Sequence, residues 1–331
     1  MNHRRQTNKS NTLFCFRVMT FAIFAIAATS CSQSEVGTKD RPFTMYFVPS
    51  VDAEQITTTA DTMTKFIQKH VSQTLYGKDQ GFYVSSAVPA SYIAVVEAFG
   101  TKKADFAAFN TFSYILAKDI KKYDVDVIFS VLRGEGERFY KGQIIAREGS
   151  GIKSIKDLQG KKFAYTDPAS TSGFILPSSI LKKAGVKPSQ IVFANKHDNV
   201  VSMIYQGQVD AGATFYSPPD EAGIRDARAR VKTQFPDVED KVKIIGFTEE
   251  IPNDPWVIRG NLYKDPARNE EVKSAIKEAI SAYTKTDDGI STLKNIYSVT
   301  GISEANDKIY DSLRSIMKTA NLDVESIMRK K

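Results

Sequence analysis

Residues Phe163 to Gly173 read Phe-Ala-Tyr-Thr-Asp-Pro-Ala-Ser-Thr-Ser-Gly, an apolar strand that runs into a turn rich in hydroxyl groups. The residues that follow predict a helix over 173–184, so Ser170, Thr171 and Ser172 lie at its start, where backbone N–H groups have no partners. A helix N-terminus carries about half a positive charge and is a ready site for an anion. Hydroxyl donors add no net charge, which suits a small tetrahedral oxyanion better than a metal ion or a nucleotide base. The alternative is an ordinary N-cap, for which Ser and Thr are favoured in any protein.

On both sides of this stretch, short apolar strands alternate with amphipathic helices. Strands are predicted over 43–48, 104–109 and 125–131 before it, and over 191–194 and 209–214 after it. This alternation is typical of parallel βα units. The sequence therefore predicts an α/β fold.

Length and charge narrow the class of protein. The chain has 331 residues, of which 42% are hydrophobic and 25% charged, ordinary values for a globular protein. This length predicts two domains, each large enough to bury a core. The net charge is +7, but four basic residues and no acids lie in the first 30 positions, so the remainder carries +3. Basic residues downstream alternate with acids, so nucleic acid is a poor hypothesis for a partner.

The N-terminus has the features of an export signal. A basic start is followed by an apolar run over 18–28 and by small residues before Cys31. The run is shorter than the roughly 20 residues that span a bilayer. A cysteine directly after small residues resembles a bacterial lipobox, with Ala28 where leucine is more usual. We therefore expect residues 1–30 to be a signal peptide and Cys31 to be lipidated. The alternatives are a plain secretory signal and an anchor formed by the N-terminus itself.

Lipidation would make the chain an exported lipoprotein, anchored to the membrane and facing the periplasm or the cell exterior. The polar segment 31–41 is expected to be the flexible tether between the lipid and the folded part.

Cysteines and known catalytic motifs are scarce. Cys15 lies in the predicted signal and Cys31 at its end, which leaves no cysteine for a disulfide, a zinc–thiolate site or a nucleophile. No dinucleotide-binding fingerprint, P-loop, zinc-protease motif or nucleophile-elbow motif is present. We expect neither a cofactor nor a metal ion, and a protein that is not an enzyme.

Several segments together resemble the phosphate-, phosphite- and phosphonate-binding proteins of ABC importers. The most specific is Asp167-Pro168-Ala169-Ser170-Thr171-Ser172-Gly173. The others are Ile155-Lys156-Asp157-Leu158, Gly185-Val186-Lys187-Pro188, His197-Asp198, Gly207-Gln208-Val209-Asp210-Ala211-Gly212 and Ile251-Pro252-Asn253-Asp254-Pro255. The similarity covers most of residues 43–320.

This resemblance implies a two-lobed fold of the type II periplasmic-binding-protein kind, with a ligand cleft between the lobes. Residues 42–147 and 250–331 would form the first lobe and residues 148–249 the second, joined by two crossings of the chain that act as a hinge. The implied ligand is a small phosphorus oxyanion, and the implied partners are an ABC permease and its ATPase. We expect the binding protein itself to be a monomer.

The resemblance also assigns ligand contacts in the second lobe. Ser170, Thr171, Ser172 and the backbone of Gly173 match the family's phosphoryl cradle. His197 matches a family position that faces the same oxyanion, where its imidazole would donate to the ligand, more strongly when protonated. The alternative for a lone histidine is a surface or capping role. The implied site thus combines hydroxyls with a histidine rather than with an arginine clamp.

Asp254 matches a family carboxylate at the cleft. A carboxylate beside an anion requires either a ligand amine or a P–OH proton between the two. The P–OH proton would also reject fully ionised sulfate. The alternative is that Asp254 only caps the turn before Pro255.

In the first lobe, Asn110 and Thr111 follow Phe109 at the end of a predicted strand, which places them at a second helix start. Phe109 stands where the family often has tyrosine, so a hydroxyl contact is lost or replaced there.

Aromatic residues are candidates for the walls of the cleft, although aromatic residues at such places are as often part of the core. Tyr46, Phe47 and Tyr140 are the candidates near strand ends. Phe215-Tyr216-Ser217 replaces an acidic residue of the amine-selective members, so Tyr216 is expected to line the pocket. The missing acid favours phosphate, phosphite or a small alkyl phosphonate over an aminoalkyl phosphonate.

Two other functions stay open at this point. One is an enzyme on the same scaffold, since a fold does not fix a function, although only His197 lies in a site-like context. The other is a ligand sensor, or a binding protein for another small anion.

Overall fold

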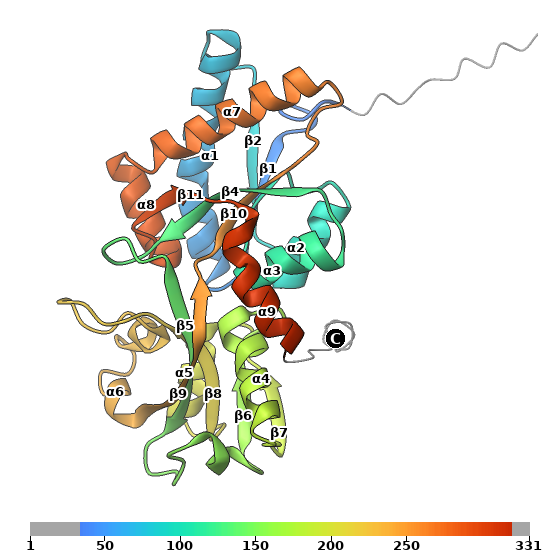
Figure 1. Ribbon diagram of the computed structural model, residues 1–331. Coiled ribbons are helices and arrows are strands. Elements are labelled where there is room, and N and C mark those ends of the chain that lie inside the picture. The colour runs from blue at the N-terminus through green and yellow to red at the C-terminus, as the bar shows by residue number, and fades with distance from the viewer. Residues whose placement is uncertain (1–33, 320–331) are drawn as a thin grey trace, which may run out of the picture. The chain divides into compact units, whose positions relative to one another are not determined.

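Two β-sheets with helices packed on both faces organise residues 34–319, the part of the chain that this computed structural model describes (Figure 1). The first sheet has the strand order β11-β4-β10-β3-β1-β2, and the second has the order β7-β6-β8-β5-β9. Each sheet is the centre of one lobe. The predicted two-lobed α/β fold is confirmed.

The first lobe is a mixed sheet between two helical layers. Its strands are β1 (Phe43–Phe47), β2 (Val84–Ala87), β3 (Phe106–Ala108), β4 (Val125–Leu132), β10 (Pro255–Arg259) and β11 (Gly301–Glu304). Its helices are α1 (Ala53–Tyr76), α2 (Tyr92–Gly100), α3 (Thr111–Ile115), α7 (Pro266–Tyr283), α8 (Asp287–Tyr297) and α9 (Asp311–Thr319). β1 is parallel to β2 and β3, and β10 is antiparallel to β3 and β4.

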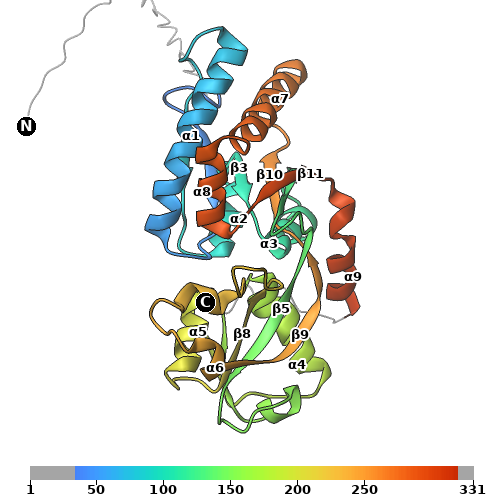
Figure 2. The same cartoon turned by 90° about the vertical axis from the view of Figure 1, so that its left-hand side faces the viewer.

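Alternating side chains of the central strands build two separate cores in this lobe. Phe106 and Ala108 pack with α1, α7 and α8, whereas Ala107 and Val257 pack with α2, α3 and α9 on the other side of the sheet (Figure 2). Successive side chains of a strand point to opposite faces, so a strand that is apolar at every position is buried on both faces. This explains the continuous apolar run over 106–109.

The second lobe is also mixed. Its strands are β5 (Phe139–Arg147), β6 (Lys162–Tyr165), β7 (Gln190–Phe193), β8 (Ala211–Tyr216) and β9 (Val242–Pro252), and its helices are α4 (Leu176–Lys183), α5 (His197–Tyr205) and α6 (Val238–Lys241). β6 is parallel to β7 and β8, which matches the predicted βα units, and β5 is antiparallel to β8 and β9.

The strands β5 and β9 correct the expected lobe boundaries. We expected the first lobe to extend to residue 147 and to resume at residue 250, but both strands belong to the second sheet. They pair with each other from Phe139 opposite Pro252 to Arg147 opposite Val242. The chain therefore changes lobe between β4 and β5 and again between β9 and β10. A local apolar pattern predicts a strand but not the sheet that it joins, which is why the boundary was misplaced.

The segment before β1 corrects the expected tether. Residues 34–41 are packed on the first lobe: Val36 is buried in its core, and Arg41 forms an ion pair with Asp105 at 2.8 Å. Gly37 has a φ of +86°, and a Cβ there would collide with the Phe82 ring. The polar composition of this segment predicted a flexible tether, but these contacts hold residues 34–41 on the first lobe.

The predicted signal peptide and the lipidation site at Cys31 lie outside the described residues. Within residues 34–319, no helix combines the length and the apolar character that a membrane crossing requires.

Candidate functional site

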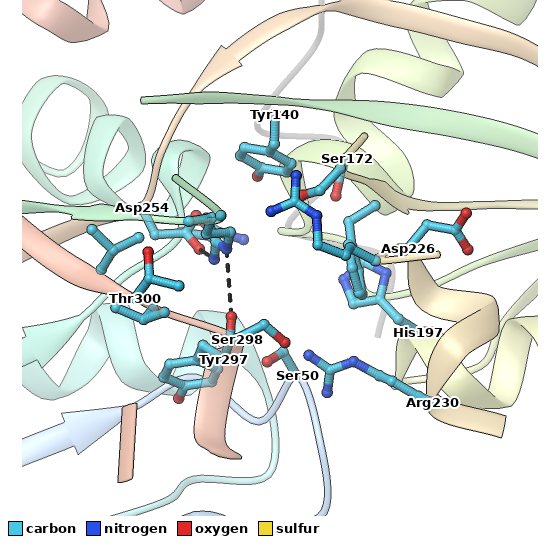
Figure 3. Close-up of a pocket in the computed structure, with 18 of the residues that line it drawn as sticks. Ser50, Tyr140, Ser172, His197, Asp226, Arg230, Asp254, Tyr297, Ser298 and Thr300 are labelled. Carbon is cyan, nitrogen blue, oxygen red and sulfur yellow. Dashed lines mark hydrogen bonds and ion pairs between the residues drawn. The ribbon is translucent and has the colours of Figure 1, made fainter. Parts of the chain in front are cut away.

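A pocket of about 490 Å³ lies between the two lobes. Polar and aromatic side chains from both lobes line it, and Figure 3 shows how several of them converge. The first lobe contributes Ser50, Tyr92, Phe109, Asn110, Arg133, Asp254, Tyr297 and Ser298, and the second contributes Tyr140, Ser170, Thr171, Ser172, His197, Phe215, Arg225 and Arg230.

The hydroxyl-rich turn begins the helix that points at this pocket. Its first turn, Thr171–Ile175, is π-helical and continues directly into α4. Pro177 has no N–H to donate to the carbonyl of Gly173, four residues earlier. That carbonyl instead accepts the backbone N–H of Thr166 at 3.1 Å. The turn is thereby bonded to the end of β6, which carries it into the pocket.

The donors expected of an anion cradle are present at this turn. Within the described chain, the backbone N–H groups of Thr171 and Ser172 have no acceptor, as expected for the first residues of a helix. All three hydroxyl side chains line the pocket and are buried. Two of them also serve the alternative role, because Ser170 Oγ accepts the N–H of Gly173 at 3.1 Å and Thr171 Oγ1 accepts the N–H of Phe112 at 2.9 Å. A hydroxyl that accepts one hydrogen bond still has its own proton to donate.

Ser172 and Tyr140 form the remaining part of this wall. The Tyr140 hydroxyl lies near the Ser172 and Thr171 hydroxyls. Burial raises the pKa of Tyr140, as does the nearby charge of Asp254, so the phenol keeps its proton. The structure thus brings Tyr140 to the cradle.

Gly173 supports the cradle from behind rather than lining the pocket. A Cβ at this position would lie 2.3 Å from Thr166 Oγ1 and 2.9 Å from Ser170 Oγ. Only glycine allows the turn to approach β6 so closely. The N–H of Gly173, expected to face the ligand, is taken by Ser170 Oγ.

His197 begins α5, lines the pocket and is buried. Burial and the positive charge of Arg230 lower the pKa of His197 to about 3, so its imidazole is neutral at neutral pH and lacks the stronger donation of the protonated form. Nδ1 lies 3.2 Å from Thr166 Oγ1, which also lies 3.2 Å from the carbonyl oxygen of Ala213. Thr166 has one hydroxyl proton for two acceptors. If it donates to Nδ1, Nε2 keeps a proton and is a donor for the pocket.

Asp254 lies in the turn between β9 and β10 and faces the pocket. Its Oδ2 forms an ion pair with Arg133 Nη2 at 2.7 Å, so the protein itself supplies a positive charge beside this carboxylate. Its Oδ1 is buried and has no hydrogen-bond partner in the described part of the chain. One acceptor of Asp254 is therefore open to a donor on a ligand.

The structure brings two of the three first-lobe candidates at residues 109–111 to the pocket wall. Phe109 and Asn110 line the pocket. Asn110 caps α3 by accepting the N–H of Ser113 at 2.7 Å, and its Nδ2 donates to the carbonyl of Ala169 at 2.9 Å, across the lobes. Thr111 does not line the pocket, because its hydroxyl donates to the carbonyl of Pro252 at 2.8 Å.

Three aromatic candidates lie elsewhere. Phe47 is buried in the core with α1 and α7, and Tyr46 packs against the core with α2 and α3, so neither lines the pocket. Strand alternation sends each side chain into a helical layer rather than past the strand end. Tyr216 lies in a separate hollow of about 300 Å³, next to Phe247. Phe215, one residue earlier, is the side chain of that segment that reaches the site.

Arginine side chains were missed in the sequence and correct the expectation of a site without an arginine clamp. Arg133, Arg225 and Arg230 all line the pocket. Arg225 pairs with Glu137 and with Asp220. The sequence signal is the cluster Arg225-Asp226-Ala227-Arg228-Ala229-Arg230, but nothing in it tells which arginine is paired inside the lobe.

Arg230 differs from the other two pocket arginines. Within the described residues it makes no hydrogen bond and no ion pair, and its guanidinium stacks 5.2 Å from the centre of the Phe215 ring. Burial lowers the pKa of Arg230, and the charge of Asp198 opposes that shift. Arginine remains charged at neutral pH in proteins.

Tyr92 and Tyr297 were also missed. Tyr92 is buried and Tyr297 is half-buried at a pocket wall, and loss of solvation raises the pKa of each well above its usual value. Tyr92 begins α2 after Ser91, which caps the helix by accepting the N–H of Ala94. A strand end followed by a capping serine was the available signal for Tyr92; Tyr297, at the end of α8, has none.

No group of three or more His, Cys, Asp or Glu side chains that would hold a metal ion occurs between residues 34 and 319.

A sequence profile of the family described as "ABC transporter, phosphonate, periplasmic substrate-binding protein" matches residues 45–310. The match covers more than half of the chain, and the protein therefore belongs to this family. The resemblance inferred from the sequence motifs is confirmed.

Individual relatives agree with this assignment. The phosphate-import protein PhnD of Mycolicibacterium smegmatis is 28% identical over 221 residues, covering 61% of this chain and 66% of that protein. The phosphonates-binding periplasmic protein of Escherichia coli is 25% identical over 227 residues, covering 66% of this chain and 62% of that protein. The chain thus spans just under two thirds of the length of these relatives.

Among solved structures, PhnD1 of Prochlorococcus marinus in complex with methylphosphonate superimposes with a TM-score of 0.65. The sequence identity is 20%, and the match covers 84% of this chain and 98% of that chain. This similarity confirms the predicted type II periplasmic-binding-protein fold.

Proposed function

We propose that this protein is an extracytoplasmic receptor that captures a small phosphorus oxyanion and delivers it to an ABC permease and its ATPase. The observation that carries the proposal is the hydroxyl cradle: three buried hydroxyl side chains line the pocket between the lobes, and the N–H groups of Thr171 and Ser172 have no acceptor among the described residues. Relatives named for phosphate import and for phosphonate binding support the ligand class.

The cradle suits a tetrahedral oxyanion because its donors come from several directions at a helix start. Ser170, Thr171 and Ser172 can each donate a hydroxyl proton to a ligand oxygen. None of these groups carries a full charge, which favours reversible capture over permanent retention. Phosphate, phosphite and small phosphonates all present this geometry.

The position of Asp254 favours a ligand oxyanion that still carries a proton. Its Oδ1 is a buried acceptor without a partner in the described chain, and a P–OH group of the ligand would donate to it. Sulfate has no such proton near neutral pH, so the same atom would repel it. Arg133 balances the charge of Asp254 and allows both anions to share the pocket.

The pocket chemistry favours binding over catalysis. With its pKa lowered to about 3, His197 would be a weak general base near neutral pH. Within the described residues, no histidine, lysine or carboxylate is hydrogen-bonded to the cradle hydroxyls, and this arrangement does not activate a nucleophile.

The location follows from the N-terminal sequence. We propose that Cys31 is lipidated after cleavage of residues 1–30 and that this lipid anchors the protein to the membrane. Labelling with a radioactive fatty acid should be lost in Cys31→Ser, and labelling that persists would contradict the anchor.

The test is a calorimetric titration of the soluble chain that begins at Ser32. We expect stoichiometric binding of phosphate, phosphite or methylphosphonate, and little binding of sulfate. Ser172→Ala should weaken oxyanion binding by about 1–3 kcal/mol, because a polar group of the ligand loses its partner in a closed site.

The matched control is Ser178→Ala on the same helix, whose hydroxyl donates to the carbonyl of Ile175 and should leave affinity unchanged. Absence of heat with every phosphorus compound would contradict the proposed function.

A further inference from the structure

Arg228 and Arg230 lie in one short 3-10 helix, Ala227–Val231, but their side chains have different surroundings. Arg228 is paired inside the lobe: it donates to both carboxylate oxygens of Asp226 and to the carbonyl of Val242. Arg230 makes none of these contacts and lines the pocket. Arg230 is therefore not needed to satisfy the groups around this turn.

The charged groups near Arg230 leave its donors open. Asp198 is the carboxylate with the largest electrostatic effect on Arg230, yet no ion pair joins the two and Asp198 Oδ1 has no hydrogen-bond partner in the described chain. Arg133 adds a positive charge nearby but is balanced by Asp254. His197 is neutral, and Tyr92 and Tyr297 are uncharged phenols. An unpaired guanidinium with few competing partners is a strong site for an anion.

Arg230 and the cradle lie at different ends of the pocket. In Figure 3, Ser172 and Tyr140 are at one end, Arg230 points toward Ser50 at the other, and His197 lies between them. Phe215 contacts both His197 and Arg230. Its ring packs edge-on against the His197 ring, with the ring centres 5.1 Å apart, and the Arg230 guanidinium lies over its face. The pocket volume of about 490 Å³ is in the range of cavities that enclose whole organic ligands, about 300–1,000 Å³. A bare phosphate would fill one end only.

We propose that the ligand carries a second anionic group, a carboxylate, that binds Arg230 while its phosphorus end occupies the cradle. The ligand class is a short phosphonate or phosphate ester with a carboxylate at its far end. This inference rests on the proposed function, since it assumes that the cradle holds phosphorus.

Carboxylate is the group of choice because the planar guanidinium presents two parallel N–H donors that match its two oxygens. The Arg230 guanidinium lies over the Phe215 ring, and both side chains line the pocket. The same positive charge disfavours a ligand with an ammonium group at this end.

The test compares ligands that differ only in the second group. Calorimetry of the wild-type chain should give at least about tenfold tighter binding of 3-phosphonopropionate than of propylphosphonate, the gain expected from charge-assisted hydrogen bonds. Phosphonoacetate and 4-phosphonobutyrate then locate the best chain length. Equal affinity for the phosphonopropionate and the propylphosphonate would overturn the inference.

Variants locate the effect at Arg230. Arg230→Gln should remove the preference for the carboxylate while leaving propylphosphonate binding within about threefold. Lys232→Gln, which removes an exposed positive charge outside the pocket, should retain the preference. An equal loss in both variants, or a loss of both ligands in Arg230→Gln, would contradict a carboxylate at Arg230.

The two proposals fail separately. If no phosphorus compound binds, the proposed function fails, and this inference fails with it. If propylphosphonate and methylphosphonate bind but the carboxylate adds nothing, the proposed function stands and this inference alone is wrong. The wild-type comparison does not depend on the folding of any variant.

Discussion

Asp105 and Asp254 are two arginine-bound carboxylates of the first lobe that differ in how completely they are paired. Asp105 has no exposed side-chain surface and accepts hydrogen bonds from Arg41, from Arg259 and from the N–H of Thr44. Asp254 accepts from Arg133 through Oδ2 alone, and its buried Oδ1 has no partner among the described residues. The first carboxylate joins the N-terminal segment to β10, and the second faces a pocket.

This difference separates structural charges from functional ones. A buried carboxylate with every lone pair used contributes to the fold, and removing it leaves arginines uncompensated. A buried acceptor without a partner lowers stability unless a ligand completes it. The pocket contains a second incompletely paired group, Arg230. It differs from the fully paired Arg228 as Asp254 differs from Asp105.

The largest effect on stability should come from a substitution of Asp105, the fully paired carboxylate. Asp105→Asn keeps the side-chain shape but removes the charge that Arg41 and Arg259 share, so the free energy of unfolding should fall by about 3–5 kcal/mol. Urea unfolding of the ligand-free chain measures this loss. Asp126→Asn is the control, because that carboxylate is 43% exposed and pairs with Lys273, so it should change stability by less than about 1 kcal/mol. Similar small losses in both variants would remove the distinction.

A third buried carboxylate, Asp167, tests the comparison through pH. It accepts the N–H of Ala169 at 2.7 Å and pairs with no arginine among the described residues, and burial raises its pKa to about 6. Because the folded pKa exceeds the unfolded value of 3.8, its contribution is fully present below pH 3.8 and is lost as pH rises through about 6.

Relative to Asp167→Asn, the wild type should therefore lose up to about 3 kcal/mol of unfolding free energy between pH 4 and pH 7. Unfolding curves of both proteins at several pH values give this difference. A difference that stays constant with pH would show that Asp167 is ionised without cost.

Thr171 extends the comparison to an uncharged group that has both a structural contact and a proton available to a ligand. Its hydroxyl accepts the N–H of Phe112 from the other lobe, yet its proton remains available to a ligand. Thr171→Ala should weaken oxyanion binding by about 1–3 kcal/mol in calorimetry. Unchanged affinity would place the cradle elsewhere. Thr171→Ser keeps the hydroxyl and should restore most of the binding.

The smallest expected effect is a change of selectivity at Asp254. Asp254→Asn presents an amide N–H where the ligand proton is expected, so the preference for a protonated oxyanion over sulfate should fall by about 1 kcal/mol. Competition titrations with sulfate measure this preference. If selectivity is unaltered, Asp254 is a turn residue held by Arg133.

The sequence predicted the parts of the site that depend on neighbouring residues. The strand, turn and helix around Ser170, Thr171 and Ser172 lie within one continuous stretch, so their arrangement follows from local rules of helix starts. Asn110 was placed at a helix start for the same reason. The two-lobed fold came from motifs that are short and continuous.

The parts that were missed depend on distant segments. Whether β5 joins the first or the second sheet is decided by its pairing with β8 and β9. Arg225 and Arg230 of the 225–230 cluster line the pocket, whereas Arg228 pairs with Asp226 inside the lobe. Tyr46 and Phe47 end a strand, but the helical layers on both faces cover them.

Pro177 does not line the pocket, yet the position of His197 depends on it. Its ring nitrogen lacks a hydrogen, so the carbonyl of Gly173 is left to hold Thr166, and Thr166 in turn contacts the imidazole. A proline-to-alanine exchange would return that carbonyl to the helix and loosen the histidine. A substitution at Pro177, which does not line the pocket, can therefore change the position of a residue that does.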